Sequence, residues 1–298
     1  MRATLAIACS AALAVLAGCG GSPAPARGAS VAATSPAAVP ATSRTTAAPQ
    51  APAMPGAHLA PHEAVPILMY HVIGYVRPDT ALPALWVSPS EFSAEVRALK
   101  DGGFHGVTLR QLWDAWHHGA RLPSKPIVFS FDDGYEGQVR NALPTLRRQG
   151  WPGVLNLKLD NLPDLGGSRG VKRMVQAGWE IDSHTITHPD LTTVGDQQLR
   201  HELVASRSRI KRLFGRGQAA FFCYPSGRFD SHVIEAVRAA GYLAATTVQP
   251  GFAKPSADPY ELARVRVDGG TGAPALMQKI RALRTAPSVT GDGASGGE

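Results

Sequence analysis

Two adjacent carboxylates end an apolar run in the segment "PIVFSFDDGY", residues 126–135. The run has the composition of a strand that is buried on both faces, and Gly134 directly after the acids favours a turn. Neighbouring residues of a strand point to opposite faces, so Asp132 and Asp133 need not have the same role. Such a pair suits a division of labour in which one carboxylate binds a metal ion and the other accepts a proton.

Two imidazoles follow a second strand pattern in "IDSHTITHPDL", residues 181–191. Pro189 and the strand pattern before His184 argue against a helix here, so His184 and His188 are not a pair on one helix face. Two neutral imidazoles and one carboxylate make three protein ligands and leave other positions open for water and substrate. This set suits zinc and tolerates other divalent first-row ions, which acidify water and polarise a carbonyl oxygen.

A third strand pattern, "FFCYPSG" at residues 221–227, also ends in a turn. Parallel strands bring their carboxyl ends to one edge of a sheet or barrel, so the three segments are expected to converge on one cleft. Each motif alone has a plain explanation, because such turns are common and two histidines at this spacing are often solvated. Three of them on the same predicted edge favour a metal-dependent catalytic site.

Strand-like and helix-like segments alternate through the part of the chain that carries these motifs. We expect strands at 65–73, 106–109, 126–131, 153–159, 179–185, 219–227 and 242–248, and helices at 88–103, 110–119, 136–150, 168–178, 196–215, 231–241 and 273–283. Repeated strand–helix units with short links predict an α/β fold with parallel strands. About seven units favour a closed or nearly closed (β/α) barrel. An open doubly wound sheet is the alternative, although no Gly-rich phosphate motif follows an early strand.

The two ends of the chain differ in composition from the rest. Residues 1–18 have a short positive start and an apolar run that is too short to span a membrane, which is typical of a signal peptide. Their "LAGC" end resembles the bacterial lipobox, so we expect a lipoprotein signal and lipidation at Cys19, with ordinary cleavage near Ala17 as the alternative. Residues 19–62 are rich in Pro, Ala, Ser and Thr and predict a disordered tether, and 286–298 predict a flexible tail.

The remaining residues, 63–285, have the length of one domain. Cys223 is the only cysteine of this range, which excludes a disulfide within it. The net charge of +7 agrees with a solvated surface or with approach to an anionic envelope. The basic stretch "RIKRLFGR" at 209–216 lacks interleaved aromatic residues and alternates with apolar ones at helical spacing. We therefore expect no nucleic-acid partner, and nothing implies an obligate protein partner.

The three motifs together, in this order, closely resemble the leading motifs of the polysaccharide deacetylases, the NodB-homology carbohydrate esterases. The segment "ILMYHVI" at 67–73 also resembles the opening strand of many members, and the resemblance extends over residues 65–267. It implies a single catalytic domain folded as a distorted (β/α) barrel, usually with seven strands. It also implies metal-dependent removal of acetyl groups from N-acetylated sugars.

The resemblance assigns a role to each motif residue. Asp132 is expected to be the catalytic base, and Asp133, His184 and His188 are expected to bind a divalent ion, for which we predict zinc. The backbone N–H of Tyr224 is expected to help hold the developing oxyanion.

Two departures from the family pattern concern residues that assist the reaction. Many members have an arginine, which tunes the base, where this chain has Cys223, so Arg264 or Arg266 is the candidate replacement. Many members also carry a late Leu-x-His motif whose histidine is the general acid, and no histidine follows His232 in this chain. We propose His71 as the substitute acid, with the alternative that it is only hydrogen-bonded at the barrel rim.

Four residues are predicted to lie against the substrate. They are His71, Arg264, Pro225 in the rigid turn, and Thr185, which is also expected to shape the metal loop.

The expected function is de-N-acetylation of an envelope or exported polysaccharide that contains N-acetylglucosamine. The enzyme would be held by its lipid at the outer face of the plasma membrane, or in the outer membrane of a diderm host. One alternative is a non-catalytic glycan-binding lipoprotein, which the missing late histidine favours and the complete Asp-Asp-His-His set disfavours. A second alternative is an esterase that removes O-acetyl groups from sugars with the same metal site.

Overall fold

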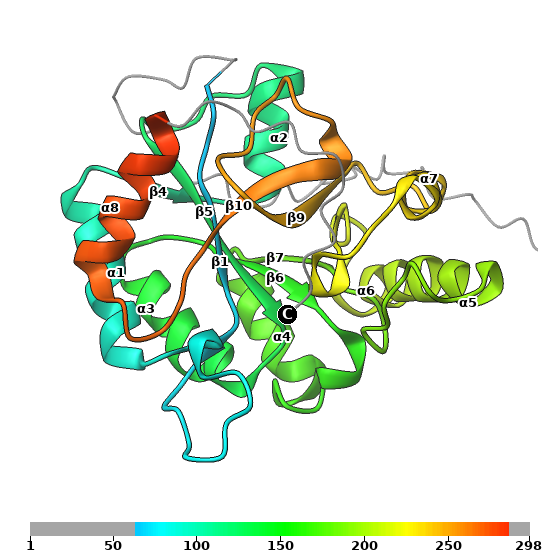
Figure 1. The fold of residues 1–298 in the computed structure, drawn as a ribbon, viewed down its shortest axis with the longest axis horizontal. Coiled ribbons are helices and arrows are strands. Elements are labelled where there is room, and N and C mark those ends of the chain that lie inside the picture. The colour runs from blue at the N-terminus through cyan, green and yellow to red at the C-terminus, as the bar shows by residue number, and fades with distance from the viewer. Residues whose placement is uncertain (1–62, 286–298) are drawn as a thin grey trace, which may run out of the picture. The chain divides into compact units, whose positions relative to one another are not determined.

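Seven parallel strands close into a ring in the computed structural model, which describes residues 63–285 (Figure 1). The order around the ring is β1 (Ile67–Tyr70), β10 (Leu262–Arg266), β9 (Ala244–Pro250), β8 (Phe221–Cys223), β7 (Glu180–Ser183), β6 (Val154–Leu157) and β5 (Pro126–Asp133). The ring closes because β1 pairs with β10 on one side and with β5 on the other. The expected α/β barrel is confirmed.

One member of the ring differs from the sequence-based expectation. The predicted strand at 106–109 exists as β4 (His105–Val107), but it pairs only with the start of β5, while β6 pairs with the second half of β5. The seventh strand of the ring is instead β10, whose sequence "LARVR" was not predicted as a strand. Its alternation of apolar and charged residues suggests a solvent-facing strand, whereas Arg264 is buried in the barrel.

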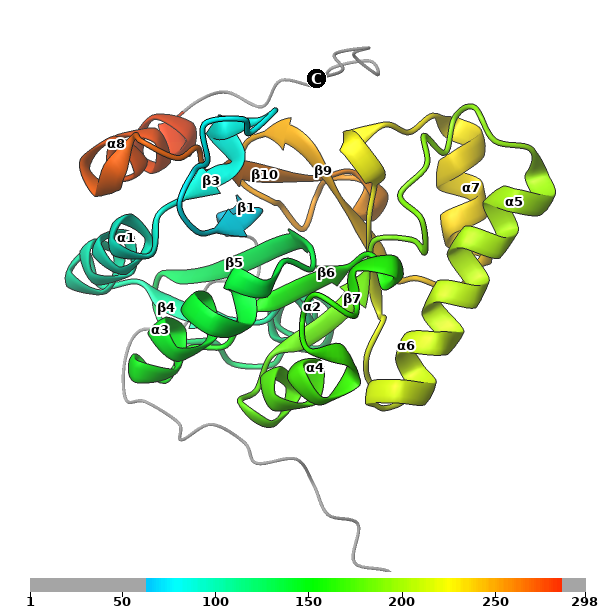
Figure 2. The ribbon, with the colours of Figure 1, turned by 90° about the horizontal axis from the view of Figure 1, so that it is seen from below.

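Helices cover the outside of the ring, and α8 lies beside α1 (Figure 2). The helices are α1 (Pro89–Asp101), α2 (Leu109–His118), α3 (Leu143–Arg148), α4 (Gly167–Gln176), α5 (Asp196–Arg200), α6 (Ser206–Phe214), α7 (Ser231–Ala239) and α8 (Gly272–Thr285). The short strands β2 (Val72–Ile73) and β3 (Trp86–Val87) form a separate pair. Side-chain caps from Ser88, Thr108 and Asp230 fix the starts of α1, α2 and α7. None of the helices within residues 63–285 is long and apolar enough to cross a membrane.

Two of the expected helices contain a π-helical turn. The first, Gln138–Ala142, precedes α3, where Pro144 lacks the N–H that a regular helix would use. This agrees with the interruption that Pro144 predicts. The second, His201–Ala205, divides the expected helix 196–215 into α5 and α6 and was not anticipated. Turns of this kind are frequent at functional sites, and this one contacts the candidate active site.

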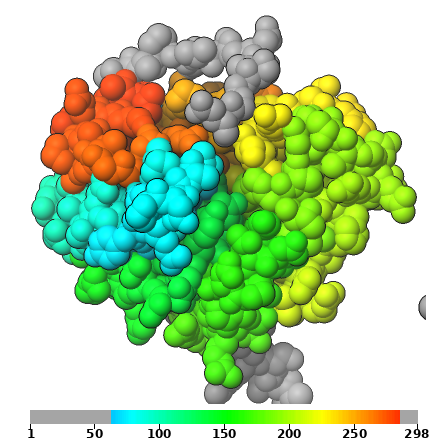
Figure 3. Space-filling model, turned by 60° about the horizontal axis from the view of Figure 1, so that its bottom comes forward, coloured from blue at the N-terminus to red at the C-terminus, as the bar shows by residue number. Residues whose placement is uncertain are grey.

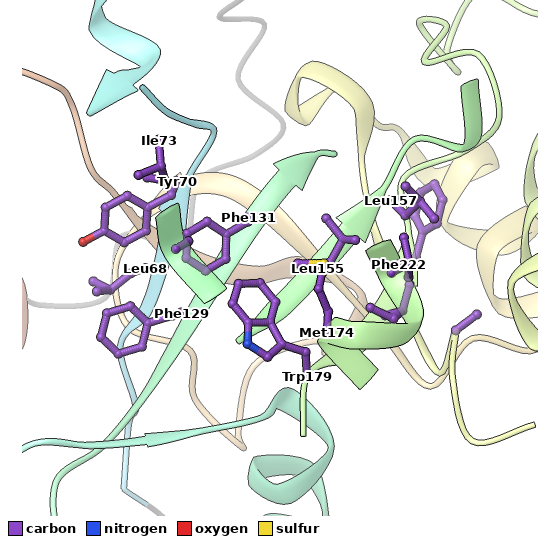
Figure 4. Close-up of a cluster of buried hydrophobic side chains, with 14 of the residues drawn as sticks. Leu68, Tyr70, Ile73, Phe129, Phe131, Leu155, Leu157, Met174, Trp179 and Phe222 are labelled. Atoms are coloured by element: carbon purple, nitrogen blue, oxygen red, sulfur yellow. The ribbon is translucent and has the colours of Figure 1, made fainter. Parts of the chain in front are cut away.

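Alternate residues of each strand enter two different cores. On β5, Phe129 and Phe131 point outward into the layer between ring and helices, where Phe131 stacks on Tyr70 and Trp179 (Figure 4). The inward residues near the strand starts, such as Val128, form a second apolar cluster inside the ring. The inward residues closer to the carboxyl ends are buried and polar, among them Ser130, Asp132, Asn156 and Arg264. The fold therefore places its buried polar groups toward the edge where the motifs lie.

Candidate active site

Three ligand-type side chains converge where β5 and β7 end. Oδ1 of Asp133 lies 3.5 Å from Nε2 of His184 and 3.6 Å from Nε2 of His188. These distances are too long for hydrogen bonds. They are close to the edge of a tetrahedron whose metal–ligand bonds measure about 2.0–2.1 Å, which is about 3.3–3.4 Å. The residues present therefore fit the divalent ion that the sequence predicts.

Hydrogen bonding fixes which ring nitrogen of His184 faces Asp133 and His188. Its Nδ1 lies 2.8 Å from the carbonyl oxygen of Cys223 and must carry a proton to donate to it, which leaves the lone pair of Nε2 directed toward Asp133. Burial lowers the pKa of His184, but contacts with Cys223 and the charges of Asp132 and Asp133 outweigh it and raise this pKa to about 10. The potential at the ring of His184 therefore favours a cation.

The backbone of the candidate metal site adopts an uncommon conformation. Asp133, Thr185 and His188 have positive φ values of 72°, 67° and 66°, in the left-handed region that favours glycine. Such conformations persist where surrounding contacts enforce them, and they cluster at functional sites. Here the N–H of His188 donates to Oγ1 of Thr185 at 2.9 Å, and the N–H of Lys158 donates to the carbonyl of Asp133 at 3.1 Å.

Asp132 points into the ring, where it lies near His184 and Cys223, and it is 2% exposed. The guanidinium of Arg264 donates to both of its oxygens at 2.8 Å, and the amide of Asn156 donates to Oδ1 at 2.7 Å. Burial would raise the pKa of Asp132, but Arg264, and then His71, more than offset it and hold this pKa well below its usual range. Asp132 is therefore ionised at neutral pH beside the candidate metal site.

The expected substrate contacts of three residues need correction. Arg264 is 1% exposed and its guanidinium faces Asp132, which is the contact expected of a replacement arginine and not of a residue that lies against substrate. Thr185 and Pro225 are also buried, so they shape the backbone of the metal loop and of the turn. Arg266, the other candidate replacement, is exposed and pairs with Asp268.

His71 is the fourth of the residues that were predicted to lie against the substrate. Its side chain is 16% exposed, and its Nε2 lies 3.8 Å from Oδ2 of Asp132. Its Nδ1 is buried without a hydrogen-bond partner in the described part of the chain. Burial lowers the pKa of His71, and the charges of Asp132 and Asp133 partly offset this. The imidazole is thus placed between the base and the open end of the ring.

The backbone N–H of Tyr224 does not point freely into the cleft. It donates to the carbonyl of Thr246 at 3.3 Å, as part of the pairing between β8 and β9. The Tyr224 ring is buried against Phe222 and Phe229, outside the site. That this N–H helps to hold the oxyanion stays a prediction, in which the oxyanion replaces the carbonyl of Thr246 at the end of a long, 3.3 Å hydrogen bond.

Further site residues were missed from the sequence. Tyr135 directly follows Gly134 after the two acids, and burial and the charge of Asp133 hold the pKa of Tyr135 above its usual range. The amide of Gln138 donates to the carbonyls of His71 and Asp132 at 2.8 and 2.7 Å and so ties β1 to β5. Asn156 could have been found, because an amide inside the apolar strand pattern "GVLNLKL" requires a buried partner.

In Figure 3 the cyan segment after β1 and the yellow segment after β8 border a hollow on the face that is shown. The predicted lipidation at Cys19, the signal and tether (1–62) and the tail (286–298) lie outside the described residues.

The chain was compared with protein families, curated proteins and solved structures. The model of the family "Polysaccharide deacetylase" matches residues 119–245. The chain is 29% identical over 229 residues to the "Putative polysaccharide deacetylase YxkH" of Bacillus subtilis, across 74% of this chain and 77% of that protein. It is 28% identical over 146 residues to the "Peptidoglycan-N-acetylmuramic acid deacetylase PdaA" of the same organism, across 48% of this chain and 53% of that protein.

Among solved structures, the Streptococcus pyogenes deacetylase PplD in complex with acetate has the same fold. The TM-score is 0.67 at 24% identity, over 73% of this chain and 98% of that chain. Over the residues that the family model and YxkH match, the chain is thus similar to the polysaccharide deacetylases, which are metal-dependent hydrolases that act on carbon–nitrogen bonds.

Proposed function

We propose that the protein removes N-acetyl groups from a polysaccharide of the cell envelope or an exported matrix that contains N-acetylglucosamine. The observation that carries this proposal is the separation of the two acids. Asp133 faces His184 and His188, whereas Asp132 faces Arg264. A divalent ion on the first set, zinc in our expectation, would polarise the acetamide carbonyl and acidify a water molecule.

Asp132 is the group that accepts a proton from the attacking water. Arg264 keeps it ionised, and the ion pair leaves it no freedom to rotate away from the site. His71 would deliver a proton to the leaving nitrogen. Because burial lowers the pKa of His71, the imidazole would first take up the proton that Asp132 accepts from the water, and its Nε2 lies 3.8 Å from Oδ2 of Asp132. This assignment supplies the general acid that the late part of the chain lacks.

The competing functions make different demands on the same residues. A glycan-binding protein without turnover would not require a buried, ionised Asp132 beside a metal-type site. An O-acetyl esterase would use the same groups, and the name of PdaA, an N-acetylmuramic acid deacetylase, supports the N-acetyl substrate for this chain.

The deciding experiment is the release of acetate from a panel of glycans. The panel contains N-acetylglucosamine oligomers of different linkage, peptidoglycan and O-acetylated xylan, each with protein that is metal-loaded, chelator-treated, or the Asp132→Asn variant. We expect acetate from an N-acetylated member, only with metal and only with Asp132. Release from xylan alone would establish the esterase, and glycan binding without acetate release from any member would establish the binding protein.

We also propose that the enzyme is lipid-anchored at Cys19 and faces the outside of the membrane. The apolar run that ends in "LAGC" supports this proposal. Wild-type protein is expected in the membrane fraction, and Cys19→Ser is expected to leave that fraction or remain unprocessed. An unchanged distribution of Cys19→Ser would reject the anchor.

A further inference from the structure

Glu202 contacts the loop that joins His184 and His188 but is not one of the three metal-type donors. Its carboxylate accepts hydrogen bonds from the N–H of Ile186 at 2.7 Å, the N–H of Thr187 at 3.2 Å and the hydroxyl of Thr187 at 2.6 Å. Glu202 is 2% exposed. One buried side chain therefore satisfies the two backbone donors in the middle of this short loop.

These contacts matter because the loop cannot hold its shape by regular secondary structure. Thr185 and His188, on either side of the two donors, both have left-handed backbone conformations. If the carboxylate were removed, these two part-buried N–H groups would lose the acceptor that Glu202 provides. A small rotation of the loop would satisfy them elsewhere, but it would also move His188 relative to His184 and Asp133.

The helix that carries Glu202 is itself tied to the end of β7. Oγ of Ser206 lies 2.8 Å from Oγ of Ser183, the residue before His184, and it donates to the carbonyl of Glu202 at 2.5 Å. The hydroxyl of Tyr242 donates to the carbonyl of Leu203 at 2.8 Å. The π-helical turn His201–Ala205 lies at these contacts, which gives the unexpected interruption of the helix a role.

We propose that Glu202 is a positioning residue that sets the geometry of the metal loop through backbone hydrogen bonds. The proposal rests on the proposed function, because its effect is exerted on the metal site. Glu202 is expected to act by accepting hydrogen bonds and not by its charge. Variants that keep or remove the acceptor can separate these two effects.

The test compares two substitutions of similar length. In Glu202→Gln, the amide oxygen can accept from both N–H groups while the NH₂ donates to the Thr187 hydroxyl. In Glu202→Met, no acceptor remains. Metal-stripped proteins are titrated with Zn²⁺ against a chelator to obtain the dissociation constant, and with Co²⁺ to record the visible absorption spectrum. The unfolding midpoint of each metal-free protein is measured alongside.

We expect Glu202→Gln to bind Zn²⁺ almost as tightly as wild type and to show the same Co²⁺ spectrum. Glu202→Met is expected to bind about 10- to 100-fold more weakly, with an altered spectrum, as when an outer partner of a metal ligand is removed. Thr187→Val removes one of the three contacts and should weaken binding less. Glu95→Gln is the matched control, because Glu95 is also buried but is hydrogen-bonded to Tyr70.

Each adverse result has a distinct meaning. Wild-type affinity and spectrum in Glu202→Met overturn the proposal, as does equal weakening in Glu95→Gln. If Glu202→Gln loses as much Zn²⁺ affinity as Glu202→Met, the proposal is overturned and the charge of Glu202 is what matters. If Glu202→Met does not fold, Thr187→Val decides, and wild-type affinity in that variant overturns the proposal. A wild-type protein that binds neither ion refutes the proposed function instead.

Discussion

At the scale of single residues, the two neighbouring acids of β5 have opposite surroundings. Asp133 lies at the carboxyl end with two imidazoles, and Asp132 lies inside the ring with a guanidinium and an amide. Strand geometry alone produces this difference, because consecutive side chains alternate between faces. Each acid can therefore be removed separately with a separate consequence.

The first prediction separates the two acids. Asp132→Asn should retain metal and lose several orders of magnitude in kcat, because it removes the proton acceptor but no ligand. Asp133→Asn should lose metal affinity first, and activity as a result. Metal content by elemental analysis and acetate release at saturating metal measure the two effects. Equal loss of metal in both variants would contradict the assignment.

The second prediction concerns the partner of the base. Arg264→Met leaves a buried carboxylate without its cation and should destabilise the fold by about 3–5 kcal/mol, while the metal ligands remain. Arg264 holds the pKa of Asp132 in the folded protein below the pKa in the unfolded chain, which is about 4. The ion pair therefore stabilises the fold fully at pH values above about 4. This stability is lost as the pH falls through the folded-state pKa. In the variant, burial raises the pKa of Asp132, so the acid limb of the activity profile should move to higher pH.

Arg266→Met is the control for that variant, because it lies on the same strand but is exposed and pairs with Asp268. Urea unfolding at neutral pH and the pH dependence of acetate release are measured for both. An Arg264→Met protein as stable as Arg266→Met, with an unchanged acid limb, would show that the ion pair has no role.

At the scale of elements, the segment that carries His71 is held by a close approach between β2 and the π-helical turn after β5. A Cβ on Gly137 would lie 2.1 Å from the carbonyl oxygen of Ile73, and Asn141 donates to the same oxygen at 2.8 Å. Glycine is required at this contact for lack of space, since its backbone conformation is an ordinary right-handed one.

The third prediction follows from this contact. Gly137→Ala should push β2 and His71 away from Asp132, lowering stability by about 1–3 kcal/mol and activity by more than stability alone explains. Metal affinity should stay near wild type, because none of the metal ligands is on β2. Gly195→Ala is the control, since a Cβ there meets nothing within 4 Å. If Gly137→Ala is as active as Gly195→Ala, the reaction does not depend on the position of His71.

Sequence reasoning identified the residues whose signal is local. The Asp-Asp, His-x-x-x-His and Tyr-Pro turns each follow a strand pattern, so their convergence on one edge could be predicted. Arg264 was only one of two candidates, because its contact with Asp132 joins positions 132 residues apart. Glu202 gave no signal, since a glutamate in an amphipathic helix is usually solvated and only the fold shows what lies over it.

At the scale of the whole domain, the metal-type donors join two strands that are not neighbours. Asp133 ends β5, while His184 and His188 follow β7, with β6 between them. An ion held by all three would link these parts of the ring and bind only the folded chain.

The fourth prediction is therefore a stability effect. Zn²⁺ at about 100 times its dissociation constant should stabilise the metal-stripped protein by about 2.7 kcal/mol. Thermal unfolding with and without metal measures it. The His184→Ala, His188→Ala double variant should show no shift, and a full shift in that variant would place the ion elsewhere.

The closure of the ring between β1 and β10 also determines when the domain can fold. These are the first and last strands of the ring, so a chain still being synthesised cannot close it before residue 262 has been added. By then all three metal-type donors have been present for more than seventy residues, while Asp132 still lacks Arg264. Long-range pairings of this kind make folding slow. A newborn chain is therefore expected to keep the ring open until β10 has been synthesised.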